Sequence, residues 1–362
     1  MAKKEVARAL IFLIILAGVL MYLTSAFSFP SGKEGDGIKE RFNSFYNQPD
    51  NTIDGVYFGS SGVDRYWIGP QAYHDSGETV FTLSTGSQPL VFIKYLMEEV
   101  LKTQDTELFI VDLRSAARTP DQVSDSFIRR VTDNMKPSLN RVKATEAVLE
   151  YASKGDNKVD EDDVSYYIPF LKYHSMWNGG ISLDNLIHLN PSTNFMGYAA
   201  HTDVIYKSRT QPQPEVTSEM TPIDKETEKV LLDLLDYCDS LEQEILFVVS
   251  PYPEDKNVQS QLNYAVNLVE KRGYDALNFN TQDLYDAVGL DFNTDYYDNH
   301  HVNLVGALKY TSYLSEYLRE HYNLPDRRKD SHYDNWESSY KSYKEATEEG
   351  AKLLNQRIQA KK

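Results

Sequence analysis

The feature that most constrains the fold is a regular alternation of short apolar runs with longer helical patterns. Residues 107–113 form a nearly continuous apolar run, which is typical of a strand buried on both faces of a sheet. Short β-rich runs also cover residues 52–58, 78–83, 244–249 and 276–280. The pattern predicts a strand in each of these ranges.

Between these runs, apolar residues recur at helical spacing. The spacing predicts helices over residues 89–102, 224–240, 257–271 and 302–320. Strands that alternate with helices form a parallel sheet with helices on both faces, so we expect a three-layer α/β/α domain. In such domains the functional residues gather at the carboxyl ends of the strands.

The N-terminus holds an apolar run without charged residues, from 9 to 29, that is long enough to cross a bilayer. Three basic residues precede it, namely Lys3, Lys4 and Arg8. Positive charge on that side predicts an N-terminus in the cytoplasm and a domain outside the cell membrane. Residues 24–26 also fit a signal-peptidase site. The run is longer than the apolar part of a usual signal peptide, which favours a retained single-pass anchor.

The composition divides the chain into segments. Residues 1–30 hold the anchor, and residues 31–50 predict a juxtamembrane spacer with a short helix. The α/β domain spans residues 51–325, and a predominantly helical insertion interrupts it at 137–222, where the strand rhythm is lost. Residues 326–362 are polar and predict a helical surface tail.

Charge and metal-ligand spacing exclude several classes of function. The net charge of −17 argues against a nucleic-acid partner, because a phosphate-binding surface needs concentrated Lys and Arg. Cys238 is the single cysteine, so no internal disulfide can form. The acidic stretch 156–163 lacks the glycine and terminal glutamate of a calcium loop, and no His/Cys cluster has zinc spacing. We therefore expect neither a metal nor a cofactor.

A candidate nucleophile follows the first predicted strand, at Gly59-Ser60-Ser61-Gly62. A serine just past a strand and flanked by glycines can place its hydroxyl in the crevice above the sheet. Backbone N–H groups at the start of a following helix would surround the same point and stabilise an oxyanion. Glycine–serine turns are also common without catalysis, so Ser61 needs a base to complete the pattern.

A candidate base stands just before the last long predicted helix. Asp298 and His301 lie three residues apart in one loop, so both can face the same crevice. The carboxylate would bond the distal ring nitrogen and orient the imidazole as a base for serine. His300 is an alternative base, but its spacing to Asp298 suits a triad less well. The competing interpretation is an aspartate that caps the helix beside surface histidines.

Taken together, these motifs resemble the SGNH/GDSL hydrolase superfamily, whose fold is a flavodoxin-like α/β/α sandwich. Ser61 matches the nucleophile of its first block, with Ser60 in place of the usual Asp, and Gly86 matches the oxyanion glycine of the second. Asp298 and His301 match the Asp-x-x-His of the last block. The Gly-Ser-Ser motif and N-terminal anchor are most similar to the exported branch that contains the D-alanine transfer protein of teichoic-acid modification.

The third block of the family's pattern is different in this chain. It normally supplies Gly-x-Asn-Asp, whose Asn donates to the oxyanion, whereas here Asp112-Leu113-Arg114-Ser115 follows the third predicted strand. Losing one such donor typically costs about a hundredfold or more in rate. Arg114 is a candidate replacement, and an alternative role for it is a structural salt bridge.

The expected function is that of an extracytoplasmic serine esterase or O-acyltransferase with Ser61, His301 and Asp298 as its catalytic residues. The oxyanion donors would be the Ser61 and Gly86 amides, with Arg114. The resemblance implies a cell-envelope polysaccharide or teichoic-acid-like polymer as substrate, and a multi-spanning membrane O-acyltransferase as partner. The alternative is a non-catalytic envelope binding or scaffold protein that keeps the fold.

Two residues of the predicted insertion are candidates for a substrate groove. His174 and Trp177 lie in a Tyr-His-Ser-Met-Trp run, in which aromatic rings could contact a sugar. The competing interpretation of His174 is a structural histidine with its hydrogen bonds satisfied.

Overall fold

The computed structural model describes residues 2–26, 29–30, 37–156, 159–175, 195–200 and 215–361. Its centre is a parallel sheet in the order β2-β1-β3-β4-β5. The strands are β1 (Gly55–Gly59), β2 (Val80–Ser84), β3 (Leu108–Asp112), β4 (Glu244–Val249) and β5 (Asp275–Asn278). The prediction of an α/β fold with a parallel sheet is thus confirmed.

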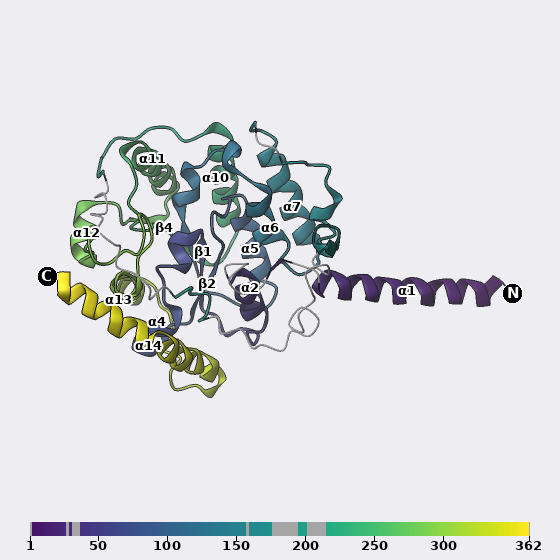
Figure 1. Cartoon of the computed structure of the whole chain (residues 1–362). Coiled ribbons are helices and arrows are strands. Elements are labelled where there is room, and N and C mark those ends of the chain that lie inside the picture. The colour runs from purple at the N-terminus through teal and green to yellow at the C-terminus, as the bar shows by residue number, and fades with distance from the viewer. Residues whose placement is uncertain are drawn as a thin grey trace.

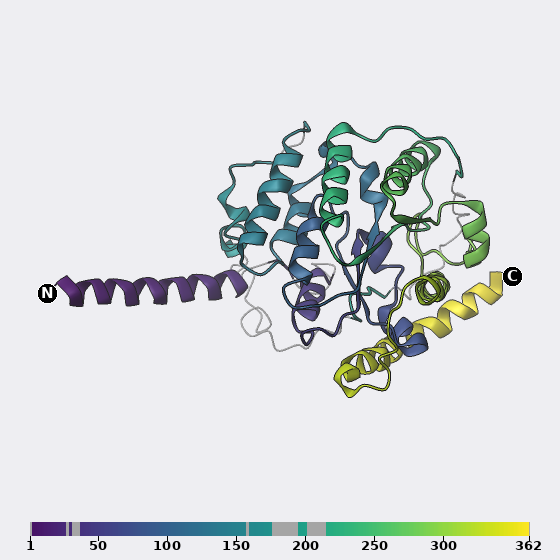
Figure 2. The same cartoon turned by 180° about the vertical axis from the view of Figure 1, so that it is seen from behind.

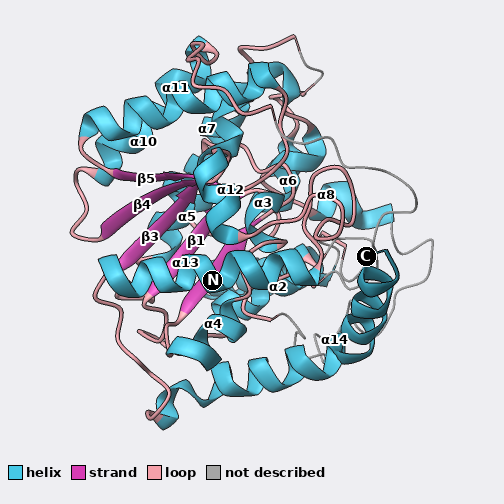
Figure 3. Cartoon of the chain, turned by 90° about the vertical axis from the view of Figure 1, so that its left-hand side faces the viewer, coloured by secondary structure: helices cyan, strands magenta, loops and turns pink. Residues whose placement is uncertain are grey.

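Successive strand residues point to opposite faces of the sheet, and each face has its own apolar core. On β1, Phe58 belongs to one core cluster and Tyr57 to the other. The first cluster includes side chains of α2 (Ile38–Tyr46), α5 (Phe92–Val100), α6 (Asp125–Thr132), α7 (Leu139–Ala152), α10 (Lys225–Cys238) and α11 (Lys256–Arg272). The second includes side chains of α3 (Ser61–Asp64), α4 (Gly69–Ser76), α12 (Gln282–Val288), α13 (Leu304–His321) and α14 (Asp334–Lys361). Helices therefore lie on both faces, which is compatible with a three-layer α/β/α arrangement (Figure 3).

The N-terminal helix α1 (Ala2–Ala26) projects from the domain (Figure 1). Its stretch Lys3–Leu23 has a mean hydropathy of 2.5 and none of it is buried. A helix of this length and composition is able to cross a membrane, although a signal sequence has the same properties.

The short helix expected within the 31–50 spacer is α2, and its apolar side belongs to the core. Ile38, Phe42 and Phe45 are each at most 2% exposed. Their spacing of four and three residues places them on one helical face. The folded domain therefore begins at or before Ile38 rather than after residue 50.

The polar stretch from 326 onward is attached to the domain along one stripe. Trp336, Tyr343 and Leu354 of α14 are each at most 1% exposed, and the helix packs on α4. Before the helix, Arg327 makes a two-pronged ion pair with Asp54, next to β1. Figure 2 shows α14 running along the underside of the domain to the C-terminus, at the opposite end from α1.

The described part of the predicted insertion at 137–222 begins with α7, which packs on α5 in the same layer. A turn of 3₁₀ helix, η4 (Val164–Tyr166), and the short helix α8 (Phe170–Tyr173) follow it. Farther along the chain, Met196 accepts a backbone hydrogen bond from Thr82 of β2, so residues 195–200 run beside the sheet edge.

Candidate active site

Two glycines shape the turn that carries Ser61. Gly59, at the end of β1, has φ 153°, and a Cβ there would come within 2.6 Å of the Asp112 Cβ. At Gly62 an added Cβ would collide with the Ser250 hydroxyl and lie 3.1 Å from Arg114 Nη1. Only glycine fits these two close approaches. The turn therefore holds Ser61 at the carboxyl end of β1, on the first residue of α3.

The Asp298–His301 loop is closed by its own hydrogen bonds. One carboxylate oxygen of Asp298 accepts the backbone N–H groups of His300 and His301, both at 2.7 Å. The Tyr297 N–H donates to the His301 carbonyl at 3.0 Å. Behind the loop, Asn303 caps α13 and donates from its amide to Thr294. The competing helix-cap role thus falls to Asn303, and Asp298 supports the histidine loop.

The structure brings Ser61, His301 and Asp298 into one hydrogen-bonded chain. His301 Nε2 lies 2.8 Å from Ser61 Oγ, and its Nδ1 lies 2.8 Å from the second oxygen of Asp298. A carboxylate accepts only, so Nδ1 carries a proton and donates to it. Nε2 is then left to accept the proton of the serine hydroxyl. This is the geometry that a serine nucleophile and its base require.

Electrostatics keep Asp298 ionised. Burial by itself would raise the pKa of Asp298, but the hydrogen bond and charge of His301 and the two backbone N–H groups outweigh it and lower the pKa to about 2. The carboxylate is therefore negative throughout the physiological range and faces the Nδ1 of His301.

Aromatic rings hold the two histidines in place. Tyr252, after β4, stacks on His300 with a centroid distance of 4.7 Å and meets His301 edge-on at 5.3 Å. Tyr297 stacks on the His301 ring at 5.7 Å. Burial lowers the pKa of His300, so this ring favours the neutral form. Of the two histidines, His301 contacts Ser61 and His300 packs on Tyr252.

The Arg114 guanidinium lies over the turn of the candidate nucleophile. Its Nε pairs with Glu254 at 3.3 Å, and its central carbon lies 3.1 Å from the Tyr252 ring centroid. Arg114 is 8% exposed, and its Nη1 is buried without a hydrogen-bond partner among the described residues. Among the atoms of the Arg114 side chain, Nη1 would lie nearest to a Cβ added at Gly62. Nη1 is therefore a buried donor next to Gly62 whose hydrogen-bonding capacity is not used within the described residues.

The Gly86 loop lies at the same edge of the sheet, because Ser84 of β2 is the register partner of Gly59. The Gly86 carbonyl accepts a hydrogen bond from Arg130 Nη1 at 2.7 Å. Arg130 and Arg118 both lie over the Phe127 ring, at 5.3 and 6.0 Å. Burial, and then the charge of Arg114, lower the pKa of Arg118. Guanidinium groups therefore gather near this edge in a chain that is acidic overall.

The two groove candidates of the insertion are not joined to this site in the part of the chain that the structure describes. His174 is exposed just after α8, and its Nδ1 lies 2.8 Å from the Leu171 carbonyl. This hydrogen bond matches the structural interpretation of His174. Trp177 lies outside the described residues.

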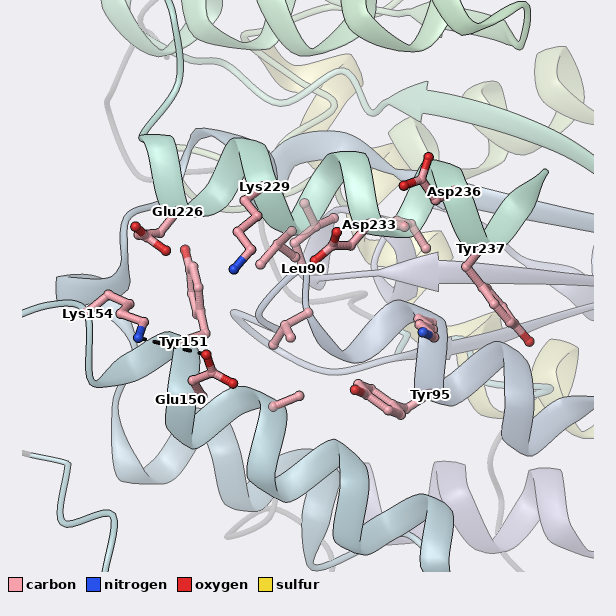
Figure 4. Close-up of a pocket in the computed structure, with 15 residues that line it drawn as sticks. Leu90, Tyr95, Glu150, Tyr151, Lys154, Glu226, Lys229, Asp233, Asp236 and Tyr237 are labelled. Atoms are coloured by element: carbon pink, nitrogen blue, oxygen red, sulfur yellow. Dashed lines mark ion pairs between the residues drawn. The ribbon is translucent and has the colours of Figure 1, made fainter. Parts of the chain in front are cut away.

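A pocket of about 500 Å³ lies between α5, α7 and α10, away from these residues (Figure 4). Its walls carry charges of both signs, including Glu150 and Lys154, which pair with each other. None of Ser61, Asp298 or His301 lines it. Among the described residues, no group of three or more His, Cys, Asp or Glu side chains is placed to hold a metal ion.

Sequence reasoning did not single out Tyr252, Glu254, Arg118 or Arg130. The only signal for the first two was the Ser-Pro that ends the predicted strand 244–249, since residues just after a strand reach the active edge. No protein-family model matches the chain, and no curated protein is similar to it in sequence.

Proposed function

We propose that this protein is an SGNH-type serine esterase or O-acyltransferase that acts on acyl esters of a cell-envelope glycopolymer. The observation that carries the proposal is the hydrogen-bonded chain from Ser61 Oγ through His301 to Asp298. Three residues drawn from two distant parts of the sequence meet with the distances that acyl transfer requires.

The first half of the reaction forms an acyl-enzyme. The Ser61 oxygen attacks the ester carbonyl while its proton passes to His301 Nε2. His301 then gives this proton to the leaving alkoxide as the carbon–oxygen bond breaks. Asp298 remains ionised and stabilises the imidazolium between the two steps, which its pKa of about 2 supports.

The second half returns the enzyme to its starting state. A water or a polyol hydroxyl attacks the acyl-enzyme, and His301 takes its proton and passes it back to Ser61. Water gives hydrolysis, and a hydroxyl gives transfer.

The negative oxygen of each tetrahedral intermediate needs donors. The Ser61 and Gly86 amides are the donors that the family resemblance implies, and Arg114 Nη1 is the third in this proposal. Its support is the burial of Nη1, its lack of a partner within the described residues and its nearness to Gly62. A preorganised donor in a site shielded from water stabilises the transition state more than a solvated one.

The proposed substrate is a teichoic-acid-like polymer or another envelope polysaccharide, reached from the outer side of the cell membrane. α1, which is long and apolar enough to act as an anchor, supports this location. Arg118 and Arg130 near the Gly86 loop suit an anionic polymer, because guanidinium groups pair well with phosphate. A multi-spanning membrane O-acyltransferase that exports the acyl group is the partner we propose.

A serine-directed fluorophosphonate tests the proposal on the full-length protein in detergent. Ser61 should become covalently labelled, and a small activated acetyl ester should be hydrolysed. Ser61→Ala and His301→Ala should each abolish both signals, and the double variant should lose little more, because the residues act as a unit. Ser60→Ala is the matched control, since this neighbouring serine is buried and should leave labelling intact.

Absence of labelling would be informative only with the proposed partner present. If the protein, alone and with a membrane O-acyltransferase, is not labelled at Ser61, and Ser61→Ala cells show unchanged acylation of the envelope polymer, the enzyme is excluded. The scaffold alternative would then take its place.

A further inference from the structure

A group of exposed apolar side chains lies on one surface of the domain. This α7–α8 face consists of Leu139, Val142, Val164, Tyr167, Ile168 and Leu171, whose exposed fractions range from 36% to 81%. The other large apolar side chains exposed outside α1, among the described residues, are Val216, Met220, Leu232 and Leu353. Contiguous exposed apolar surface of this kind is unusual on a soluble domain and marks a site of contact.

Hydrogen bonds join the elements that carry the α7–α8 face. The Arg141 guanidinium, in the first turn of α7, donates to the carbonyls of Tyr166 and Tyr167 at 2.9 and 3.2 Å. These bonds fix the start of α7, with Leu139 and Val142, beside η4. The helix α8 packs on η4 and brings Leu171 to the same surface.

The α7–α8 face lies where α1 meets the domain. α8 contacts α1, and Figure 1 shows the C-terminal end of α1 reaching the domain at this side. The chain length leads to the same conclusion without this contact. Phe29 is already part of the core and 8% exposed, only three residues after Ala26 at the end of α1. Three extended residues span about 10 Å at most, so the domain surface must lie within about that distance of the helix end.

We infer that the α7–α8 face rests on the lipid bilayer from which α1 emerges, with its apolar side chains at the boundary of headgroups and acyl chains. Leu, Ile and Val bury apolar area there, and a tyrosine suits that boundary because one end of it is apolar and the other polar. The domain would then be held in one orientation on the membrane, instead of turning freely on a tether.

The charges around the face indicate which lipid property matters. Asp160, Glu161 and Asp162 are exposed just before Val164, and Lys143 and Lys172 flank the face on α7 and α8. Mixed charge of this kind gives no net attraction to anionic headgroups. The contact therefore rests on apolar burial and forms on a neutral bilayer.

Nitroxide labels on the full-length protein test this contact. Cysteine replaces Ile168 or Leu171, and the protein is placed as single copies in nanodiscs of neutral phosphatidylcholine. The native Cys238 is 2% exposed and burial raises its pKa to about 12, so it stays unlabelled in the folded protein. Leu353→Cys is the matched control, because Leu353 on α14 is 48% exposed and Leu171 is 47% exposed.

The readout is the accessibility of each label to two reagents. Oxygen concentrates in the acyl region of the bilayer, whereas a nickel complex stays in the water. Labels at 168 and 171 should shift toward oxygen relative to the label at 353. Adding Leu139→Glu should return the label at 168 toward the aqueous value.

Labels at 168 and 171 that match the one at 353 would overturn the inference. So would protection that appears only when two copies share a disc, since a second copy would then cover the face. Neither result bears on the chemistry at Ser61, because α1 and the α7–α8 face alone carry this inference.

Discussion

Arg114→Gln is the most discriminating change, because it separates an oxyanion donor from a structural ion pair. In the proposed mechanism, Arg114 Nη1 replaces the missing donor of the third block. Its loss should lower kcat/KM by about 10²–10³, which corresponds to about 2.7–4 kcal/mol of transition-state stabilisation. The loss should fall mainly on kcat, because the donor acts on charge that develops only in the transition state.

The same change also disturbs folding, so activity alone cannot decide. Arg114 pairs with Glu254, whose side chain is 15% exposed. Removing one member of a largely buried ion pair leaves the other charge unpaired, which lowers the free energy of unfolding by roughly 3–5 kcal/mol. Glu254→Gln is the matched control, since it breaks this ion pair but leaves the guanidinium stacked on Tyr252 and Nη1 beside Gly62. It should lose stability in a urea titration and keep kcat/KM within about tenfold.

The assay is hydrolysis of a small activated acetyl ester by protein that is shown to be folded at the assay temperature. Equal losses of activity in Arg114→Gln and Glu254→Gln would refute the donor role, because both changes would then act through the ion pair. A folded Arg114→Gln protein within about tenfold of the wild type would refute it as well.

Three further changes test other parts of the structure. Asp298→Asn should lower kcat/KM by about 10³–10⁴ with unchanged folding, because an amide that donates to Nδ1 leaves the proton on the nitrogen facing Ser61; full activity would remove Asp298 from the mechanism. Burial raises the pKa of Glu78 from 4.5 to about 7, so the contribution of Glu78 to stability is fully present below pH 4.5 and is lost as the pH rises through 7. Glu78→Gln should therefore be more stable at pH 8 by up to about 3 kcal/mol in urea unfolding, and equal stability there would show that the charge is solvated. Arg41→Met should destabilise the protein by roughly 3–5 kcal/mol, since it removes the closer ion pair of the buried Asp64, at 2.7 Å, and leaves only Arg65, at 3.9 Å, within the described residues; adding Asp64→Asn should restore part of the loss, and an unstable variant without such recovery would contradict the pairing.

The sheet could be predicted from the sequence because its strands are buried on both faces. A run such as 244–249, with five of its six residues buried, leaves a nearly continuous apolar signal, and β4 has these same bounds. The meeting of Ser61 with His301 was also predictable in outline, since residues at the carboxyl ends of parallel strands share one edge. Its distance of 2.8 Å depends on the loop that Asp298 and Asn303 close, which no periodicity encodes.

The contribution of α2 was harder to predict. Ile38, Phe42 and Phe45 repeat at helical spacing, but the flanking glycines and charges resemble a spacer, and nine residues are too few for a strong amphipathic signal. Long-range partners such as Glu254 for Arg114 are equally invisible, because a charged residue in a sequence gives no sign of which opposite charge will lie beside it.

The burial of α2 has a consequence for the site, because α2 carries Arg41. This side chain is fully buried and pairs with Asp64, in the turn that begins at Ser61, at 2.7 Å. It also donates to the carbonyl of Ser84 at the end of β2 and to that of Gly197, at 2.7 and 2.8 Å. A buried charge with several partners is fixed in position, since any displacement leaves an ion unpaired in a medium of low dielectric constant. Through this one side chain, α2 is joined to the turn that holds Ser61 and to the end of the strand that leads to Gly86. An anchor that sets the height of α2 above a bilayer would set the height of Ser61 with it.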